Sequence, residues 1–127
     1  MNSNNRQVIY PFDDYPKAGR TTEVAPGVHW LSTPLPFRLR AINLYLLEDD
    51  DGWTVVDCGY GRQEVRDQWE QVWSNTLARS RVRRLIVTHF HPDHAGNAAW
   101  ICERLPTRLF WSMDRNEIMR LGLGQIR

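Results

Sequence analysis

Three histidines and one aspartate lie within six positions of the chain, in the segment 88–97 with the sequence THFHPDHAGN. His89 and His91 are separated by one residue, so in an extended chain their side chains point to the same side and can bind one metal ion. Asp93 and His94 follow after a proline has turned the chain, and they can reach a second ion. Imidazole and carboxylate suit zinc, with iron and manganese as competitors. The segment contains no cysteine, which favours an open, water-bearing site over a structural zinc site.

The histidine segment joins a predicted strand to a predicted helix. RRLIVTH (83–89) is a short apolar run that ends in polar residues, as a buried strand would. AGNAAWICERL (95–105) has apolar residues at helical spacing, and Pro106 ends it. Ligands of open α/β sheets bind at the carboxyl ends of strands, where a rigid scaffold can aim loop side chains. We therefore expect the metal ligands at the carboxyl end of a strand.

The other elements predict an α/β fold in which a β-hairpin is followed by alternating helices and strands. Strands are expected at 28–31, 41–48, 53–59 and 107–112, and helices at 62–80 and 114–122. The Asp-Gly pair in DDDG (49–52) indicates the hairpin turn. Residues 1–25 have no clear hydrophobic periodicity, which indicates an extended arm. Residues 26–127 are then expected to form one domain.

Composition excludes several classes of function. The formal net charge of +1 argues against nucleic acid or an anionic membrane surface as partner. No apolar run is long enough for a membrane-spanning helix, and the first residues lack the pattern of a signal peptide. We expect a cytoplasmic protein that acts on a small molecule. Cys58 and Cys102 form no CxxC motif and read as free, buried thiols.

The segment THFHPDH resembles the HxHxDH signature of the metallo-β-lactamase-fold hydrolases. TVVDCG (54–59) is similar to the early strand of that fold, which ends in an Asp-x-Gly turn, and DHAGN is similar to the glyoxalase II branch. The resemblance covers roughly residues 24–121 and implies that His89 and His91 bind the first metal, and Asp93 and His94 the second. It also implies that Asp93 orients the bridging water and accepts a proton.

The same resemblance implies that Asp57 supports the 88–97 segment, here called the metal loop, by hydrogen bonds. The alternative is that Asp57 only forms the turn at the end of its strand. The family also has a third histidine on the first metal, and a bridging aspartate and a last histidine on the second, all after this motif. No histidine follows His94 here, and Asp114 comes too early for the bridging role. His29 lies on a predicted strand, where we expect it to be packed.

The family fold is a four-layer αββα sandwich of two similar halves, and this chain resembles the amino-terminal half. We expect the chain alone to be an incomplete and inactive hydrolase. It would be a truncated form, the product of a split gene, or a chain that self-associates to build its site.

The resemblance implies hydrolysis of a small ester or thioester by a metal-bound hydroxide, with one or two zinc ions. One alternative is a non-catalytic remnant that binds metal or a partner. Another is the nuclease branch of the family, for which Arg79, Arg81, Arg83 and Arg84 would form a phosphate track rather than a solvated surface.

Overall fold

The computed structural model describes residues 7–36, 41–76 and 81–111. Its elements, in chain order, are β1 (Thr22–Ala25), β2 (Val28–Pro34), β3 (Ala41–Asp49), β4 (Gly52–Val56), α1 (Gln63–Asn75), β5 (Val82–Val87), α2 (Pro92–Ala95), α3 (Ala98–Arg104) and β6 (Arg108–Trp111). The predicted helix 114–122 and its Asp114 lie outside the described residues, and so does Arg79.

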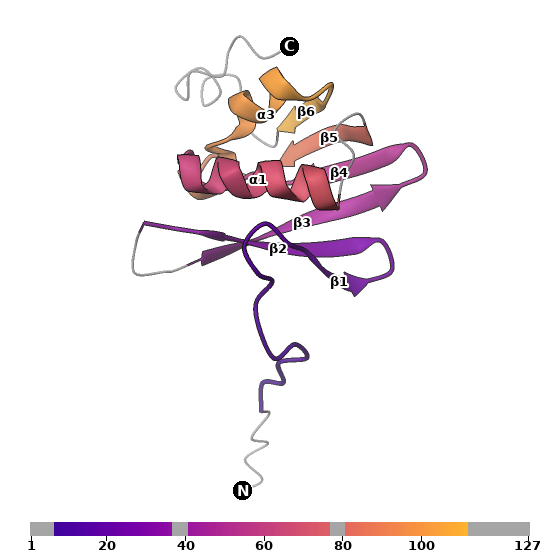
Figure 1. The fold of residues 1–127 in the computed structure, drawn as a ribbon, viewed down its shortest axis with the longest axis vertical. Helices are drawn as coiled ribbons and strands as arrows, with labels where there is room; N and C mark the ends of the chain where they lie inside the picture. The colour runs from indigo at the N-terminus through magenta and orange to yellow at the C-terminus, as the bar shows by residue number, and fades with distance from the viewer. Residues whose placement is uncertain (1–6, 37–40, 77–80, 112–127) are drawn as a thin grey trace, which may run out of the picture.

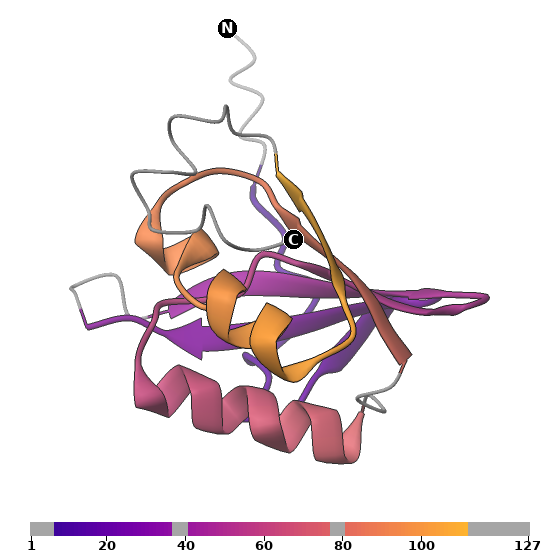
Figure 2. The same ribbon diagram turned by 90° about the horizontal axis from the view of Figure 1, so that it is seen from above.

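One six-stranded sheet carries these elements, with its strands in sequence order from β1 to β6 (Figure 1). The strands from β1 to β4 pair antiparallel, and β4, β5 and β6 pair parallel. Parallel neighbours need crossover connections, which α1 and the α2–α3 segment provide. Both α1 and α3 cover the same face of the sheet (Figures 1 and 2). The predicted α/β class and the order of a hairpin followed by alternating helices and strands are confirmed.

The core lies between the sheet and its helices. The predicted apolar face of α1 is buried, through Val65, Trp69, Val72 and Trp73. These side chains share one hydrophobic cluster with sheet residues that are completely buried, among them Leu31, Leu44, Leu46, Val55 and Leu85. Each such side chain contributes about 1.5–3 kcal/mol through its removal from water. This burial fixes the position of α1, and with it the loop between β4 and α1.

The amino-terminal segment differs in part from the expected arm. Residues 7–21 contain no helix or strand, but Thr22–Ala25 pair with β2 as an edge strand. Phe12 and Tyr15 pack against the Trp30 ring, with centroids 5.9 and 5.5 Å from it. Strand β2 also runs three residues beyond its predicted end, to Pro34, because its register with β3 continues. Short edge strands of this kind depend on a paired neighbour rather than on their own sequence pattern.

The face of the sheet opposite the helices carries an apolar row. The strand register places one residue from each of five neighbouring strands side by side on this face: Trp30, Tyr45, Val56, Ile86 and Phe110. Tyr45 is 39% exposed and Phe110 is 43% exposed. Phe12 and Tyr15 contact the Trp30 end of this row, and an apolar row with exposed side chains favours contact with another protein surface.

We expect the chain to self-associate through this apolar row. Replacing Tyr45 and Phe110 together by lysine should shift the chain toward the monomer, because two ammonium groups would have to leave water at the contact. Sedimentation velocity over a concentration series measures the effect. The matched control is the pair Ser74→Lys and Asn75→Lys, which adds the same charge at exposed positions of α1. A wild-type chain that stays monomeric at every concentration would contradict the expectation.

Candidate metal centre

The 88–97 segment leaves the carboxyl end of β5 and turns into α2. His89 and His91 come before the turn, and Asp93 and His94 lie within the short helix α2. Pro92 takes the first helical position, where its fixed φ suits the start of a helix and no amide hydrogen is needed. The structure therefore places the segment between a strand and a helix as predicted. The single predicted helix 95–105 is instead the end of α2 followed by α3.

The predicted ligand side chains converge on one region. The ligand atoms of His89, His91 and Asp93 lie within 4.8 Å of one another, and so do those of Asp57, His89 and His94. The ring centroids of His89 and His94 are 4.0 Å apart, and those of His89 and His91 are 4.8 Å apart. His89 belongs to both groups, so these groups do not separate into the pairs His89/His91 and Asp93/His94 that the sequence analysis assigns to two metals.

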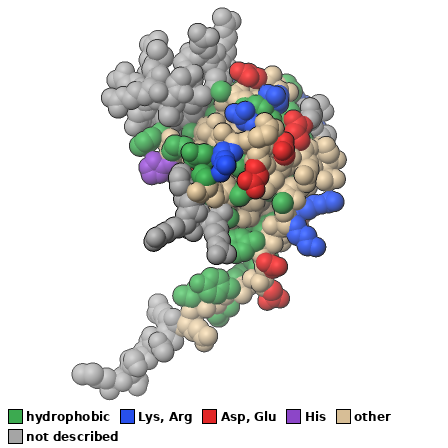
Figure 3. All heavy atoms as spheres, turned by 60° about the vertical axis from the view of Figure 1, so that its left-hand side comes forward, with side chains coloured by type: hydrophobic (Ala, Val, Ile, Leu, Met, Phe, Trp, Pro, Cys, Tyr) green, Lys and Arg blue, Asp and Glu red, His purple; other side chains and the backbone are tan. Residues whose placement is uncertain are grey.

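The donor set fits a metal ion of the zinc, iron or manganese kind. It consists of imidazole nitrogens and carboxylate oxygens, which are the ligands that these ions take in proteins. Nε2 of His94 lies 3.6 Å from a carboxylate oxygen of Asp93, so the two groups face the same small volume. His91 is exposed and the other three are partly buried, which leaves the site open to solvent on one side. Figure 3 shows a histidine side chain at the surface, bordered by hydrophobic side chains.

The side chain of Asp57 supports the metal loop through hydrogen bonds. Its carboxylate accepts hydrogen bonds from the backbone N–H of Thr88 at 2.8 Å, from the Thr88 hydroxyl at 2.7 Å and from Nδ1 of His94 at 2.8 Å. The residue is 6% exposed and has φ = 62°, a left-handed conformation in which aspartate is tolerated better than most residues. Strained backbone conformations of this kind, kept by surrounding hydrogen bonds, are typical of functional sites.

The bond between Asp57 and His94 also decides which nitrogen of His94 can bind metal. Nδ1 donates to the carboxylate, so the lone pair is on Nε2, the atom that faces Asp93. A histidine that donates its other ring hydrogen to a carboxylate is the usual arrangement of a metal ligand. These hydrogen bonds are of the kind that the family resemblance implies for Asp57, and its role, like the ligand roles, stays a prediction.

Asn97 is a positioning residue that the sequence analysis missed. Its side chain is completely buried and donates to the backbone carbonyls of Cys58 and Tyr60, at 3.0 and 2.9 Å, while Arg66 donates to its oxygen at 3.1 Å. Asn97 immediately precedes α3, where an asparagine usually caps the helix with its side chain, but it makes no such bond. It ties the 58–60 backbone, which follows Asp57, to the end of the metal loop.

Gly96 allows the same two loops to approach closely. A Cβ atom on Gly96 would lie 2.6 Å from the backbone nitrogen of Gly61 and 3.0 Å from the carbonyl oxygen of Gly59. Real Cβ atoms do not come as close to a backbone nitrogen as 2.6 Å, so any larger residue at position 96 would push the loops apart. The sequence alone does not predict this contact, because a glycine after a short helical segment equally indicates the end of a helix.

Cys58 supports the loop and is not placed among the ligands. Its backbone N–H and its thiol both point to the carbonyl oxygen of His94, at 2.8 and 3.0 Å. Burial raises the pKa of the Cys58 thiol above its ordinary value, which keeps the thiol protonated as a donor. Burial likewise raises the pKa of Cys102, to about 11. Both cysteines are free, as predicted, but only Cys58 is buried, whereas Cys102 is partly exposed.

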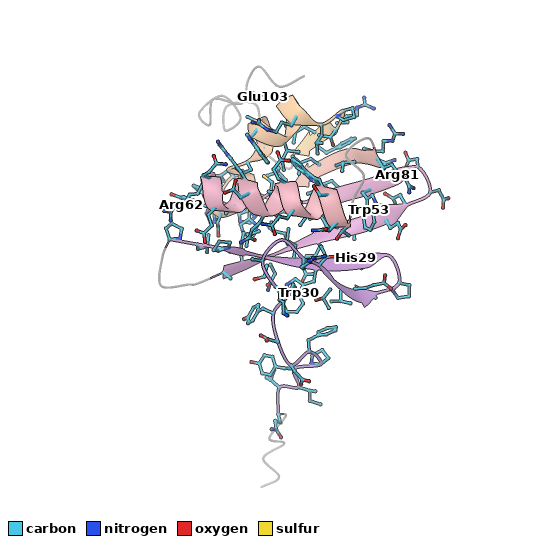
Figure 4. The ribbon with its side chains drawn as sticks, viewed as in Figure 1. His29, Trp30, Trp53, Arg62, Arg81 and Glu103 are labelled. Atoms are coloured by element: carbon cyan, nitrogen blue, oxygen red, sulfur yellow. The ribbon has the colours of Figure 1, made fainter. Side chains whose placement is uncertain are left out.

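His29 and Arg84, one of the described arginines of the predicted phosphate track, make their contacts away from the metal loop. Nε2 of His29 is 3.2 Å from Glu23, and its ring packs edge-on against Trp53 at 5.1 Å (Figure 4), as expected for a packed strand histidine. Arg84 contacts the carboxylates of Asp49 and Asp51 at 3.3 and 2.8 Å, beside the β3–β4 turn. The Arg84 guanidinium lowers the pKa of the Asp51 carboxyl. These groups flank the amino end of β5, whereas the metal loop follows its carboxyl end.

No helix in the described part of the chain combines the length and the apolar character that a membrane crossing requires.

A family model for the metallo-beta-lactamase superfamily matches residues 37–124. Two curated proteins are similar to the chain. A protein of Aspergillus fumigatus described as an atrochrysone carboxyl ACP thioesterase is 27% identical over 110 residues, which are 77% of this chain and 34% of that protein. A probable metallo-hydrolase of Bacillus subtilis, YqjP, is 31% identical over 67 residues, which are 52% of this chain and 21% of that protein.

Solved structures share the fold. A beta-lactamase domain protein from Burkholderia ambifaria superposes with a TM-score of 0.79 at 48% identity, over 90% of this chain and 38% of that one. A metallo-beta-lactamase family protein from Thermus thermophilus superposes with a TM-score of 0.61 at 32% identity, over 69% of this chain and 29% of that one. The chain thus spans between about a fifth and two fifths of the length of these four relatives.

Proposed function

The chain belongs to the metallo-beta-lactamase superfamily, and on that premise we propose that it carries the metal-binding loop of a hydrolase that cleaves a small ester or thioester. The observation that carries the proposal is the convergence of the histidines and Asp93 at a strand end, with His94 held by Asp57. The thioesterase named among the relatives supports a thioester as the substrate class.

Four side chains would hold the metal. We propose His89 and His91 as ligands of one ion, and Asp93 and His94 as ligands of a second, with zinc first and iron or manganese as competitors. When bound, such an ion lowers the pKa of a water molecule toward about 7 and polarises the carbonyl of the substrate. The side chain of Asp93 is 26% exposed, so one oxygen can orient that water and accept its proton while the carboxylate stays near His94.

The proposed ligand set gives each ion two protein ligands, whereas a catalytic zinc usually has about three and keeps one position for water. We therefore propose that further ligands come from another segment of polypeptide or from a second copy of the chain. An ion that only two side chains hold would be poorly fixed in place, so its bound water would be poorly oriented and the reaction slow even with the metal present. The chain assayed alone should bind zinc and hydrolyse its substrate slowly or not at all.

The test compares zinc binding with hydrolysis of three substrates, a thioester, a lactam and a phosphodiester. It uses the chain alone and a fusion to the part of the Burkholderia relative that this chain does not cover. Zinc binding with hydrolysis of the thioester by the fusion supports the proposal. If only the phosphodiester is hydrolysed, the chain belongs to the nuclease branch. If zinc binds but neither the chain nor the fusion hydrolyses any substrate, the chain is a non-catalytic metal-binding module. A chain that binds no zinc would contradict all three.

A further inference from the structure

Three hydrogen bonds connect His89 to His94 through Thr88 and Asp57. Nδ1 of His89 lies 2.8 Å from Oγ1 of Thr88. The Thr88 hydroxyl donates to Oδ2 of Asp57 at 2.7 Å. The same Oδ2 lies 2.8 Å from Nδ1 of His94. One carboxylate oxygen is therefore linked to both rings, directly to His94 and through a hydroxyl group to His89.

The direction of each bond follows from the groups involved. An ionised carboxylate only accepts, and a hydroxyl group has a single hydrogen, which Thr88 gives to Asp57. The Thr88 oxygen can then only accept from the ring beside it, so Nδ1 of His89 must carry a hydrogen. We propose that Thr88 is a positioning residue that sets the tautomer of His89 by relaying a hydrogen bond from its ring to Asp57.

The relay determines which atom of His89 faces the metal. With the hydrogen on Nδ1, the neutral ring presents the lone pair of Nε2, since the hydrogen bond at one ring nitrogen decides the state of the other. His94 presents its Nε2 for the same reason, and the centroids of the two rings are only 4.0 Å apart. The inference rests on the proposed function in so far as the two rings are metal ligands. It adds that a single carboxylate orients both of them.

The backbone of Thr88 makes the role of its hydroxyl separable from the fold of the loop. The N–H of Thr88 donates to the other carboxylate oxygen of Asp57 at 2.8 Å, and any residue at position 88 keeps that donor except proline. Thr88→Val therefore removes the relay and keeps the shape of the side chain and the backbone bond. Thr88→Ser keeps the hydroxyl group and removes only a methyl group.

The matched control is Thr54→Val. Thr54 is a buried threonine of β4 whose hydroxyl also donates to a carboxylate, that of Asp49, at 2.9 Å. The same substitution there removes the same kind of bond beside the β3–β4 turn, away from the metal loop.

Two measurements test the relay. The first is the nitrogen chemical shifts of the His89 ring in the metal-free chain, at a pH where the ring is neutral. Wild type, Thr88→Ser and Thr54→Val should show the hydrogen on Nδ1, and Thr88→Val should show a mixture of tautomers or the hydrogen on Nε2. The second is zinc affinity, which should fall about tenfold or more in Thr88→Val and stay near wild type in the other two.

The outcomes separate this inference from the proposed function. A wild-type His89 with its hydrogen on Nε2, or a Thr88→Val chain with unchanged tautomer, would overturn the relay whether or not zinc binds. A Thr88→Val chain with the altered tautomer and unchanged zinc affinity would overturn its role toward the metal. A wild-type chain that shows the expected tautomer and binds no zinc would instead overturn the proposed function.

Discussion

Replacing His89 with alanine should lower the zinc affinity of the chain more than any other single substitution in the site. His89 belongs to both groups of converging ligand atoms, so its loss removes a donor from the centre of the site. Loss of a residue that only supports a ligand typically lowers metal affinity about 10–100-fold, so loss of the ligand itself should lower it by more than about 100-fold. Competition with a chromophoric chelator measures this change.

The same substitution should change the stability of the metal-free chain little. The His89 side chain is partly exposed on a loop, and its removal leaves no large cavity, so the free energy of unfolding should fall by less than about 0.5–1 kcal/mol. The control is His29→Ala, which removes a histidine that packs against Trp53 outside the site. That variant should keep its zinc affinity. Equal zinc content in His89→Ala and wild type would show that His89 is not a ligand.

The place of the metal loop is the part of the site that the sequence predicts well. The apolar run of β5, the histidine spacing and Pro92 are all local, and each indicates its own conformation without reference to the rest of the chain. The buried face of α1 is predicted for the same reason, because Trp69 and Trp73 fall on one side of any helix that contains them. Local patterns suffice where neighbours in sequence decide the structure.

The supports of the loop could not be predicted in the same way. Asp57 and Thr88 are separated by 31 positions, and Asn97 and Cys58 by 39. Their hydrogen bonds exist because β4 and β5 are neighbours in the sheet and because α1 is packed against it. Asn97 shows the ambiguity directly, since asparagine before a helix predicts a cap and here tethers a loop instead. Strand β1 was missed for a related reason, because its partner β2 and not its own four residues gives it structure.

Replacing Asp57 should lower both zinc affinity and stability, in contrast to His89. In Asp57→Asn the side chain keeps its shape and tolerates φ = 62°, but its amide group turns one of two acceptors into a donor that faces other donors. We expect the free energy of unfolding of the metal-free chain to fall by about 1–3 kcal/mol. Zinc affinity should fall about 10–100-fold, because His94 and the Thr88 backbone lose the group that orients them.

Asp57→Ala should be worse than Asp57→Asn in stability. Alanine lacks all three acceptor contacts, leaves the Thr88 N–H without its partner and adds about 1–2 kcal/mol of strain in the left-handed conformation. Urea unfolding of the metal-free variants, with zinc affinity measured separately, distinguishes the two effects.

The control is Asp49→Asn, which alters a carboxylate that also accepts from a threonine hydroxyl but lies beside the β3–β4 turn. If Asp57→Ala lost stability and kept its zinc affinity, Asp57 would only be a turn former. If it lost zinc affinity at unchanged stability, the carboxylate would be better explained as a ligand itself, because a support of the loop cannot be removed without loosening what it holds.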